Sequence, residues 1–175
     1  MSVLSLRFVP DPVLKRKAQR VPRIDGSVKR LVTDMLETMR TSGGVGLAAN
    51  QVGRLQRVAV IQLPEEEEPL VLINPRVIRR EGEREVEEGC LSIPGYQGRV
   101  KRSVKIRVRA RDLSGHEIRL KAENDLLAQA LEHEIDHLNG VLYIDRLADK
   151  DSFWKLEPGT EAGQVSSKQT ADERA

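Results

Sequence analysis

Hydrophobic residues recur at helical spacing in two separate parts of the chain. The apolar positions of the first part follow i, i+3, i+4, i+7 spacing: Val28, Leu31, Val32, Met35, Leu36 and Met39. They predict an amphipathic helix over residues 27–41, which ends there because Gly43 and Gly44 follow. A second long helix is expected over about residues 124–139, ending at Gly140.

Short aliphatic runs between these helices predict β-strands. Residues 57–63 and 70–73 are such runs, and residues 105–111 alternate charged with apolar side chains, as a strand with one solvated face does. A turn then leads into a strand over residues 117–121. Shorter strands are expected on either side of a turn at Glu81 and Gly82. The order helix, strands, helix indicates an α+β fold with an antiparallel or mixed sheet.

Composition is typical of one folded domain with an aliphatic core. The chain has 175 residues, of which 39% are hydrophobic and only 3% aromatic. Aliphatic residues become sparse after Arg146, so we expect one folded domain over 1–148 and a polar, partly disordered tail over 149–175. Phe153 and Trp154 are expected to pack back on the domain.

Charge and cysteine content narrow the class of protein further. Lys and Arg (29) nearly balance Asp and Glu (27), for a net charge of +2, whereas nucleic-acid binders usually concentrate basic charge. The Arg and Lys of 105–111 are therefore interpreted as a solvated sheet face, with a nucleic-acid surface as the alternative. No apolar run is long enough to cross a bilayer, and the start lacks a signal-peptide pattern. With Cys90 as the single cysteine, we expect a cytoplasmic protein.

The second helix contains the sequence His-Glu-Ile-Asp-His. His133 and His137 are one turn apart on one helix face, a spacing that lets two imidazoles reach one metal ion. Glu134 points toward the apolar side, where an unpaired carboxylate is costly. This pattern favours a metal site of a hydrolase, with an ordinary structural histidine pair as the alternative.

A catalytic metal site needs a third protein ligand. His116 is one candidate, but it follows a Ser-Gly turn and is expected to be exposed. Cys90 is preferred, within a segment where Pro94 is interpreted as the end of a strand, although a lone buried cysteine is often an inert core residue.

The glycine-rich segment 43–51 is open to more than one interpretation. Its Gly44-x-Gly46-x-x-Ala49 spacing resembles a dinucleotide fingerprint, but that motif leaves a strand and opens a helix, and here the segment leaves a helix. A glycine helix cap followed by a tight crossover accounts for Gly43 and Gly44. It leaves Gly46 and Gln51 unexplained.

Taken together, three segments resemble the peptide deformylase family. They read GVGLAANQ (44–51), EGCLS (88–92) and HEIDH (133–137), and the resemblance covers about residues 5–147. The family often has Gln before the first histidine, where this chain has Glu132. That position lies off the ligand face, so little effect is expected.

The resemblance implies a fold, an activity and a set of site residues. Its sheets would pack around a central C-terminal helix that carries the metal ligands, with a further N-terminal helix. The activity would be removal of the N-formyl group from the formylmethionine of newly made polypeptides, with release of formate. The implied residues are Cys90, His133 and His137 for the metal, Glu134 as general acid and base, and Gln51 with the Leu91 N–H for the oxyanion. One divalent ion per chain is implied, natively Fe2+, with Zn2+ or another divalent ion as the alternative.

The substrate pocket is expected beside this centre. The residues assigned to it are Val45, Gly46, Val86, Gly89, Leu126 and Ala130, with ordinary core packing as the alternative for the four side-chain-bearing positions. Arg102 and Asp136 are candidates for a pair that orients the ligand helix.

The expected partners are nascent formyl-Met polypeptides at or near the ribosome. Direct nucleic-acid recognition and membrane binding are not expected, and the protein is expected to be a monomer. A different metallohydrolase, such as a peptidase, and a non-enzymatic metal-binding module are the alternative functions.

Overall fold

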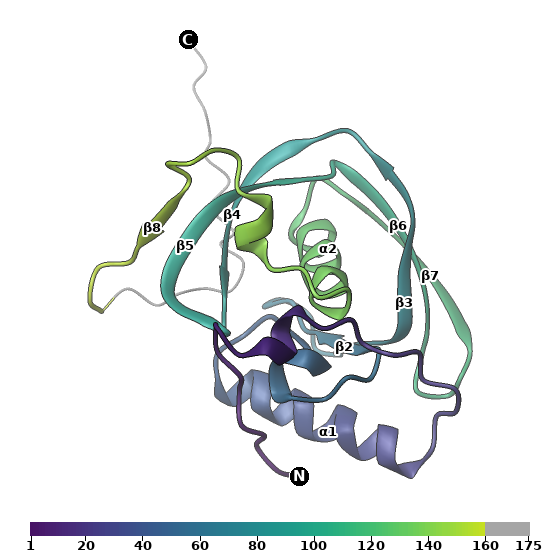
Figure 1. Cartoon of the computed structure of the whole chain (residues 1–175). Coiled ribbons are helices and arrows are strands. Elements are labelled where there is room, and N and C mark those ends of the chain that lie inside the picture. Colours follow the sequence, from purple (N-terminus) through teal and green to yellow (C-terminus); the bar gives the residue numbers. More distant parts are fainter. Residues whose placement is uncertain (160–175) are drawn as a thin grey trace.

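The computed structural model describes residues 1–159 and contains two α-helices and two antiparallel sheets (Figure 1). The helices are α1 (Gly26–Thr41) and α2 (Leu126–Leu138). The five-stranded sheet has the order β1 (Gly46–Ala48), β2 (Val58–Ile61), β3 (Leu70–Glu81), β6 (Lys105–Arg111), β7 (Glu117–Glu123). The three-stranded sheet has the order β4 (Arg84–Cys90), β5 (Ile93–Arg102), β8 (Phe153–Lys155). None of the helices in this part of the chain combines the length and apolar character that a membrane crossing requires.

Both predicted helices are present, and local capping sets where they begin. The Asp25 carboxylate accepts hydrogen bonds from the backbone N–H groups of Ser27 and Val28 at the start of α1. Helix α2 begins two residues later than expected. Asn124 has a left-handed φ of 50°, so Asp125 becomes the N-cap and accepts a bond from Ala128.

The end of α2 depends on Gly140. This residue has a φ of 75°, and a Cβ there would lie 2.5 Å from the carbonyl oxygen of Lys15. Only glycine combines the left-handed conformation with this close approach of backbone from the N-terminal region. The helix thereby packs against a segment more than a hundred residues away in sequence.

The sheets differ from the sequence-based expectation in how the strands are joined. Strand β3 continues without interruption through residues predicted as a separate strand, with irregular register between Ile73 and Arg76 and again before Arg79. The turn at Gly82 leads from β3 into β4, which belongs to the other sheet. The strands flanking this turn therefore do not pair with each other, and all pairings between named strands are antiparallel.

Three strands were not anticipated. Pro94 was interpreted as the end of a strand and is instead the second residue of β5, because the chain reverses at residues 91–92 and pairs back on β4. Strand β1 lies within the glycine-rich segment and pairs with β2. Strand β8 pairs with β5, and its Phe153 ring stacks on Tyr96 with centroids 5.0 Å apart.

One strand lies beyond Arg146, where aliphatic residues become sparse. The tail expected from residue 149 includes β8, which extends the smaller sheet, and Phe153 packs back on the domain as expected. The remaining residues for which disorder was predicted, 160–175, lie outside the described residues.

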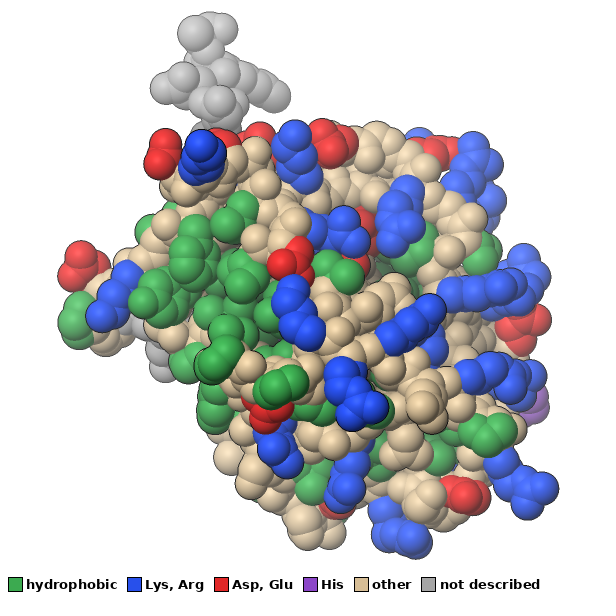
Figure 2. Space-filling model, viewed as in Figure 1, with side chains coloured by type: hydrophobic (Ala, Val, Ile, Leu, Met, Phe, Trp, Pro, Cys, Tyr) green, Lys and Arg blue, Asp and Glu red, His purple; other side chains and the backbone are tan. Residues whose placement is uncertain are grey.

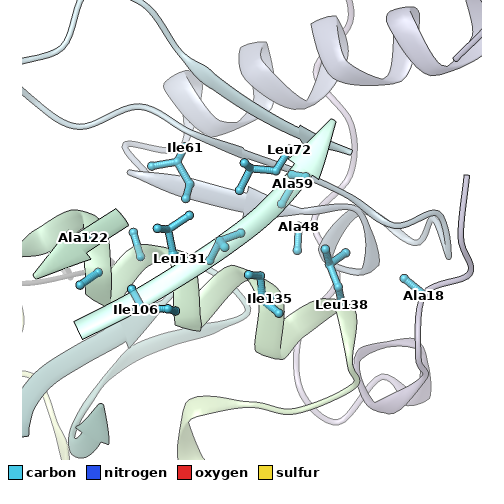
Figure 3. Close-up of a cluster of buried hydrophobic side chains, with 14 residues drawn as sticks. Ala18, Ala48, Ala59, Ile61, Leu72, Ile106, Ala122, Leu131, Ile135 and Leu138 are labelled. Carbon is cyan, nitrogen blue, oxygen red and sulfur yellow. The ribbon is translucent and has the colours of Figure 1, made fainter. Parts of the chain in front are cut away.

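Helix α2 lies between the two sheets, with β3, β6 and β7 on one side and β4 and β5 on the other (Figure 1). Its Leu131, Ile135 and Leu138 are fully buried against aliphatic side chains of the larger sheet (Figure 3). Helix α1 covers the opposite face of β1 and β2 with a second aliphatic cluster. Burial of α2 on all sides explains why a helix can carry several polar side chains into the interior, where partners hold them.

Candidate metal centre

Three ligand atoms converge between α2 and the end of β4. The Nε2 atom of His137 lies 3.3 Å from the Cys90 Sγ and 3.2 Å from the Nε2 of His133, and all three atoms lie within 4.8 Å of one another. All three residues are buried. In a tetrahedral zinc site, the bond lengths place two nitrogens about 3.3 Å apart and a nitrogen about 3.6 Å from a sulfur. The two close separations therefore match the edges of such a site.

Secondary structure brings these groups together. The two histidines are one turn apart on α2, and Cys90 is the last residue of β4, where the chain turns toward β5. The backbone N–H of Ser92 donates to the thiol sulfur at 3.4 Å, which fixes the direction of the Cys90 side chain. A strand end and a helix face separated by more than forty residues thus supply one site.

The contact between His133 and Glu88 orients the other ring nitrogen of His133 toward the cluster. Its Nδ1 lies 2.6 Å from the Oε1 of Glu88. Burial by itself would raise the pKa of the Glu88 carboxyl, but the adjacent Arg102 guanidinium outweighs burial and holds that pKa far below its ordinary value. An ionised Glu88 can only accept, so His133 donates through Nδ1, and its Nε2 is the ring nitrogen that faces His137 and that would bind a metal ion in its unprotonated form. One thiol and two imidazoles in this arrangement fit a divalent transition metal.

A buried ion network supports the histidine. Arg102 donates to both carboxylate oxygens of Glu88 and to Oδ2 of Asp136, each at 2.7 Å, and all three side chains are almost fully buried. The predicted pairing of Arg102 with Asp136 is present. Arg146 donates to both oxygens of the same Asp136, at 2.6 and 2.9 Å. Sequence reasoning assigned no role to Glu88, although it stands in the motif that contains Cys90, or to Arg146, which no motif includes.

Glu134 is buried beside this network without a complete set of partners. Its Oε2 has no hydrogen-bond partner within residues 1–159, and burial raises its pKa to about 7 against the opposing charge of His133. A Cβ on Gly46 would overlap the Glu134 carboxylate, reaching 2.9 Å from its Cδ. Gly46 therefore makes room for the carboxylate. This explains why position 46 is a glycine, which the helix cap at Gly43 and Gly44 does not explain.

Gln51 is held against the Cys90 thiol. It is fully buried, and its Oε1 accepts a bond from the Ala48 N–H at 3.0 Å. This contact turns the amide nitrogen toward Ser92 Oγ at 3.2 Å and Cys90 Sγ at 3.5 Å. Leu91 follows Cys90 directly in the turn and is half-buried.

Of the residues assigned to the substrate pocket, some lie next to the metal centre and others lie in the aliphatic core or at its edge. Gly89 is buried next to Cys90, Val86 packs on the small cluster that contains Cys90 and Tyr143, and Val45 is half-buried just before β1. Ala130 is buried in the main aliphatic cluster and Leu126 is half-buried at the start of α2. His116 lies in the turn between β6 and β7 with its side chain 80% exposed, so it does not join Cys90, as expected.

Comparison with known proteins agrees with this geometry. The sequence model of the family described as Polypeptide deformylase matches residues 3–153. A peptide deformylase of Dehalococcoides mccartyi is 45% identical over 161 residues, which cover 92% of this chain and 96% of the relative. One from Alkalilimnicola ehrlichii is 46% identical over 171 residues, covering 95% of this chain and 96% of the relative.

Solved structures of peptide deformylases are also similar to this chain, and they confirm the α+β class. The crystal structure of a peptide deformylase from Synechococcus elongatus with actinonin has a TM-score of 0.80 at 44% identity, covering 84% of this chain and 80% of that one. The peptide deformylase from Thermotoga maritima has a TM-score of 0.81 at 37% identity, covering 85% of this chain and all of that one. With a matched family model across most of its length and relatives above 40% identity, this chain belongs to the peptide deformylase family.

Proposed function

We propose that this protein hydrolyses the N-formyl group of formylmethionine at the start of newly made polypeptides and releases formate. Membership of the deformylase family supports the activity. The observation that carries the chemistry is the convergence of one thiol and two imidazoles next to the buried carboxylate of Glu134. A hydrolase needs both an electrophilic centre and a proton acceptor, and this arrangement offers both in one place.

Cys90, His133 and His137 would hold one divalent ion, with ferrous iron as the native metal and zinc or another divalent ion as a functional substitute. When bound, such an ion activates a water molecule and polarises the formyl carbonyl. The chain's own contribution is to fix the donors in place. Glu88 orients His133 through Nδ1, and Arg102 holds Glu88.

Glu134 serves as general base and then as general acid. It accepts a proton from the attacking water and delivers it to the amine as the carbon–nitrogen bond breaks, so that formate and a free N-terminus leave. Burial raises the pKa of Glu134 to about 7, which suits a group that must both take up and give up a proton near neutrality.

Gln51 and Leu91 stabilise the negative charge that develops on the formyl oxygen. The Gln51 amide is fixed with its NH2 group toward Cys90, and the Leu91 N–H is the next backbone donor along the chain. Donors fixed in advance of the reaction need no reorganisation when charge develops, and removal of one such donor typically lowers turnover about 10²- to 10³-fold.

The methionine side chain is assigned to an apolar pocket beside the centre. Its wall residues are Val45, Gly46, Val86, Gly89, Leu126 and Ala130, of which Val86 lies on the cluster that contains Cys90. An unbranched thioether side chain suits a narrow apolar pocket of this kind. We further infer that the enzyme acts as a monomer in the cytoplasm, on chains emerging at the ribosome.

One assay tests the function directly. Formyl-Met-Ala, acetyl-Met-Ala and unblocked Met-Ala are offered to the metal-loaded enzyme, and formate, acetate and free amino acids are measured. Formate release from the first substrate alone supports the proposal. Equal cleavage of all three would identify a peptidase and overturn it.

A further inference from the structure

The outer face of the larger sheet carries basic side chains in register on three neighbouring strands. The cross-strand partners form two adjacent rows, given in the order β3, β6, β7: Arg76, Arg109 and Arg119, then Arg79, Arg107 and Lys121. We refer to these six residues as the basic rows. Figure 2 shows Lys and Arg side chains gathered on the side of the molecule where Figure 1 places β3, β6 and β7.

The basic rows point away from the protein interior. Along β6 they alternate with Ile106, Val108 and Ala110, which are buried in the cluster that packs on α2. Since successive side chains of a strand face opposite sides of the sheet, the basic rows lie on the face opposite α2. A ligand bound there would leave Cys90 and its neighbours uncovered.

The fold neutralises only part of this charge. Like charges directly opposite each other on paired strands are destabilising. Glu117 contacts Arg109 at 3.2 Å and Arg119 at 3.5 Å, and Glu81 pairs with Arg79. Arg76, Arg107 and Lys121 have no carboxylate partner among residues 1–159. An external anion would relieve the repulsion.

A hollow of about 590 Å³ continues the basic surface from the first row toward the N-terminal segment. Its basic lining residues are Lys17, Arg20, Arg57, Arg76, Arg109 and Arg111, against one acidic residue, Glu117. Arg57 is half-buried and is held by the carbonyl of Pro75 at 3.0 Å and the side chain of Asn139 at 2.9 Å, both neutral acceptors. These contacts hold the Arg57 guanidinium in place, but the two neutral acceptors do not compensate its positive charge.

The spacing of the rows suits a polymer of phosphates. Side chains on one face of a strand repeat about every 6.8 Å, and neighbouring strands are about 4.8 Å apart, so the rows form a two-dimensional array of positive charge. The six residues are all Arg or Lys, and the rows offer no aromatic ring on which an unpaired base could stack. This favours contacts with a phosphodiester backbone in a double helix over contacts with single-stranded bases.

We propose that the basic rows and the adjoining hollow bind the phosphate backbone of double-stranded RNA without sequence preference. The small net charge of the chain argued against nucleic-acid recognition, but net charge does not report how charges are distributed over a surface. The choice of RNA rests on the proposed function, because new polypeptides emerge from a ribosome rich in RNA helices. Binding on this face would hold the enzyme near its substrate with the metal centre open.

Fluorescence anisotropy of a labelled 16-base-pair RNA duplex, titrated with the full chain, tests the proposal. We expect a Kd on the order of 1 µM at 50 mM salt and a slope of log affinity against log salt of about −5.4 for six phosphate contacts. Arg107→Glu with Lys121→Glu should weaken binding at least tenfold and reduce the slope to about −3.6. Lys150→Glu with Lys155→Glu makes the same charge change near β8, on the opposite side of the molecule, and should bind like the wild type (Figure 1).

A second variant, Arg76→Gln with Arg111→Gln, removes charge from the hollow without introducing acid and should also weaken binding. An RNA duplex that does not bind at 50 mM salt would overturn the proposal, as would equal affinities of the first variant and its control. Tighter binding to phosphatidylglycerol vesicles than to the duplex would identify a membrane surface instead and also overturn it. Equal binding of a DNA duplex supports the phosphodiester backbone as the ligand class.

The formyl-peptide assay on the same variants separates this inference from the proposed function. Unchanged formate release together with weakened duplex binding is the expected combination, because the basic rows lie outside the metal centre. Absence of formate release from the wild type would count against the deformylase activity, whereas the anisotropy result would still report on the backbone-binding surface.

Discussion

Gly46 lies against the carboxylate of Glu134 so closely that any side chain at position 46 would occupy the same space. A Cβ placed there would lie 2.9 Å from the Glu134 Cδ and closer still to Oε1. We expect Gly46→Ala to displace the carboxylate and lower kcat at least tenfold with metal content unchanged. Gly26→Ala, at the exposed start of α1, is the matched control and should keep full turnover. Wild-type activity in the Gly46 variant would show that the carboxylate can work from another position.

Removal of the Glu134 carboxylate should abolish proton transfer without emptying the metal centre. We expect Glu134→Gln and Glu134→Ala to lower turnover by about 10²- to 10⁴-fold, the usual range for general acid–base catalysis, with one metal ion per chain retained. Elemental analysis of the purified variants, alongside the formyl-peptide assay, measures both quantities. Loss of the metal in either variant would mean that Glu134 is a ligand.

Cys90 should be required for metal binding. Its Sγ lies 3.3 Å from the His137 Nε2, and loss of the thiolate leaves only two donors. Cys90→Ala is expected to purify with less than a tenth of the wild-type metal, whereas Ser92→Ala, which alters a neighbour of the same turn, should keep its metal. A fully metallated and active Cys90→Ala protein would remove this residue from the site.

The amide of Gln51 should affect the rate of the reaction and not the metal. Because its NH2 group is held toward the centre by the bond from Ala48 N–H to Oε1, Gln51→Ala is expected to lower kcat about 10²- to 10³-fold. KM and metal stoichiometry should stay within about twofold of wild type. A variant that changes KM alone would indicate that Gln51 binds substrate without stabilising the developing charge.

Arg102 should contribute strongly to stability because it compensates two buried carboxylates. Arg102→Met leaves Glu88 and Asp136 without their shared partner and is expected to lower the free energy of unfolding by about 3–5 kcal/mol. Arg79→Met is the control. It removes an exposed pair with Glu81 and should change stability by no more than about 1 kcal/mol. Urea denaturation of the two variants makes the comparison, and equal effects would show that the buried network is dispensable.

Local patterns predicted the elements whose signal lies within a few residues. The apolar spacing of α1 and the alternation of β6 are repeated over many positions, and both elements appear where they were expected. Strand β5 was missed because Pro94 and Gly95 near its start, together with Gly98, are residue types that are uncommon in strands. Pairing of β5 with β4 and β8 overrides this weak local preference, and such pairing is a property of the folded chain.

The residues of the candidate metal centre also fall into two groups: those predicted from the sequence and those found only in the structure. The spacing of His133 and His137 on one helix already predicted two ligands, and the need for a third ligand favoured Cys90. The resemblance to a family added Gln51 and the role of Glu134 as expectations. The involvement of Glu88 and Arg146 emerged only from the structure. A buried carboxylate is recognised by its partners: those of Glu88 are Arg102 of β5 and His133 of α2, whereas Arg146, from the segment after α2, bonds to Asp136.

The sequence by itself determined the positions of both helices, the strand character of the middle of the chain and the identity of the ligand-bearing helix. Each of these depends on side-chain chemistry repeated at short range. Only the tertiary structure decided which groups lie next to each other, such as a strand-end thiol beside a helix face, or Arg76 beside Arg109. Contacts and surface charge depend on strand register and chain reversal over long distances, and a near-neutral composition can therefore fold into a protein with one strongly basic face.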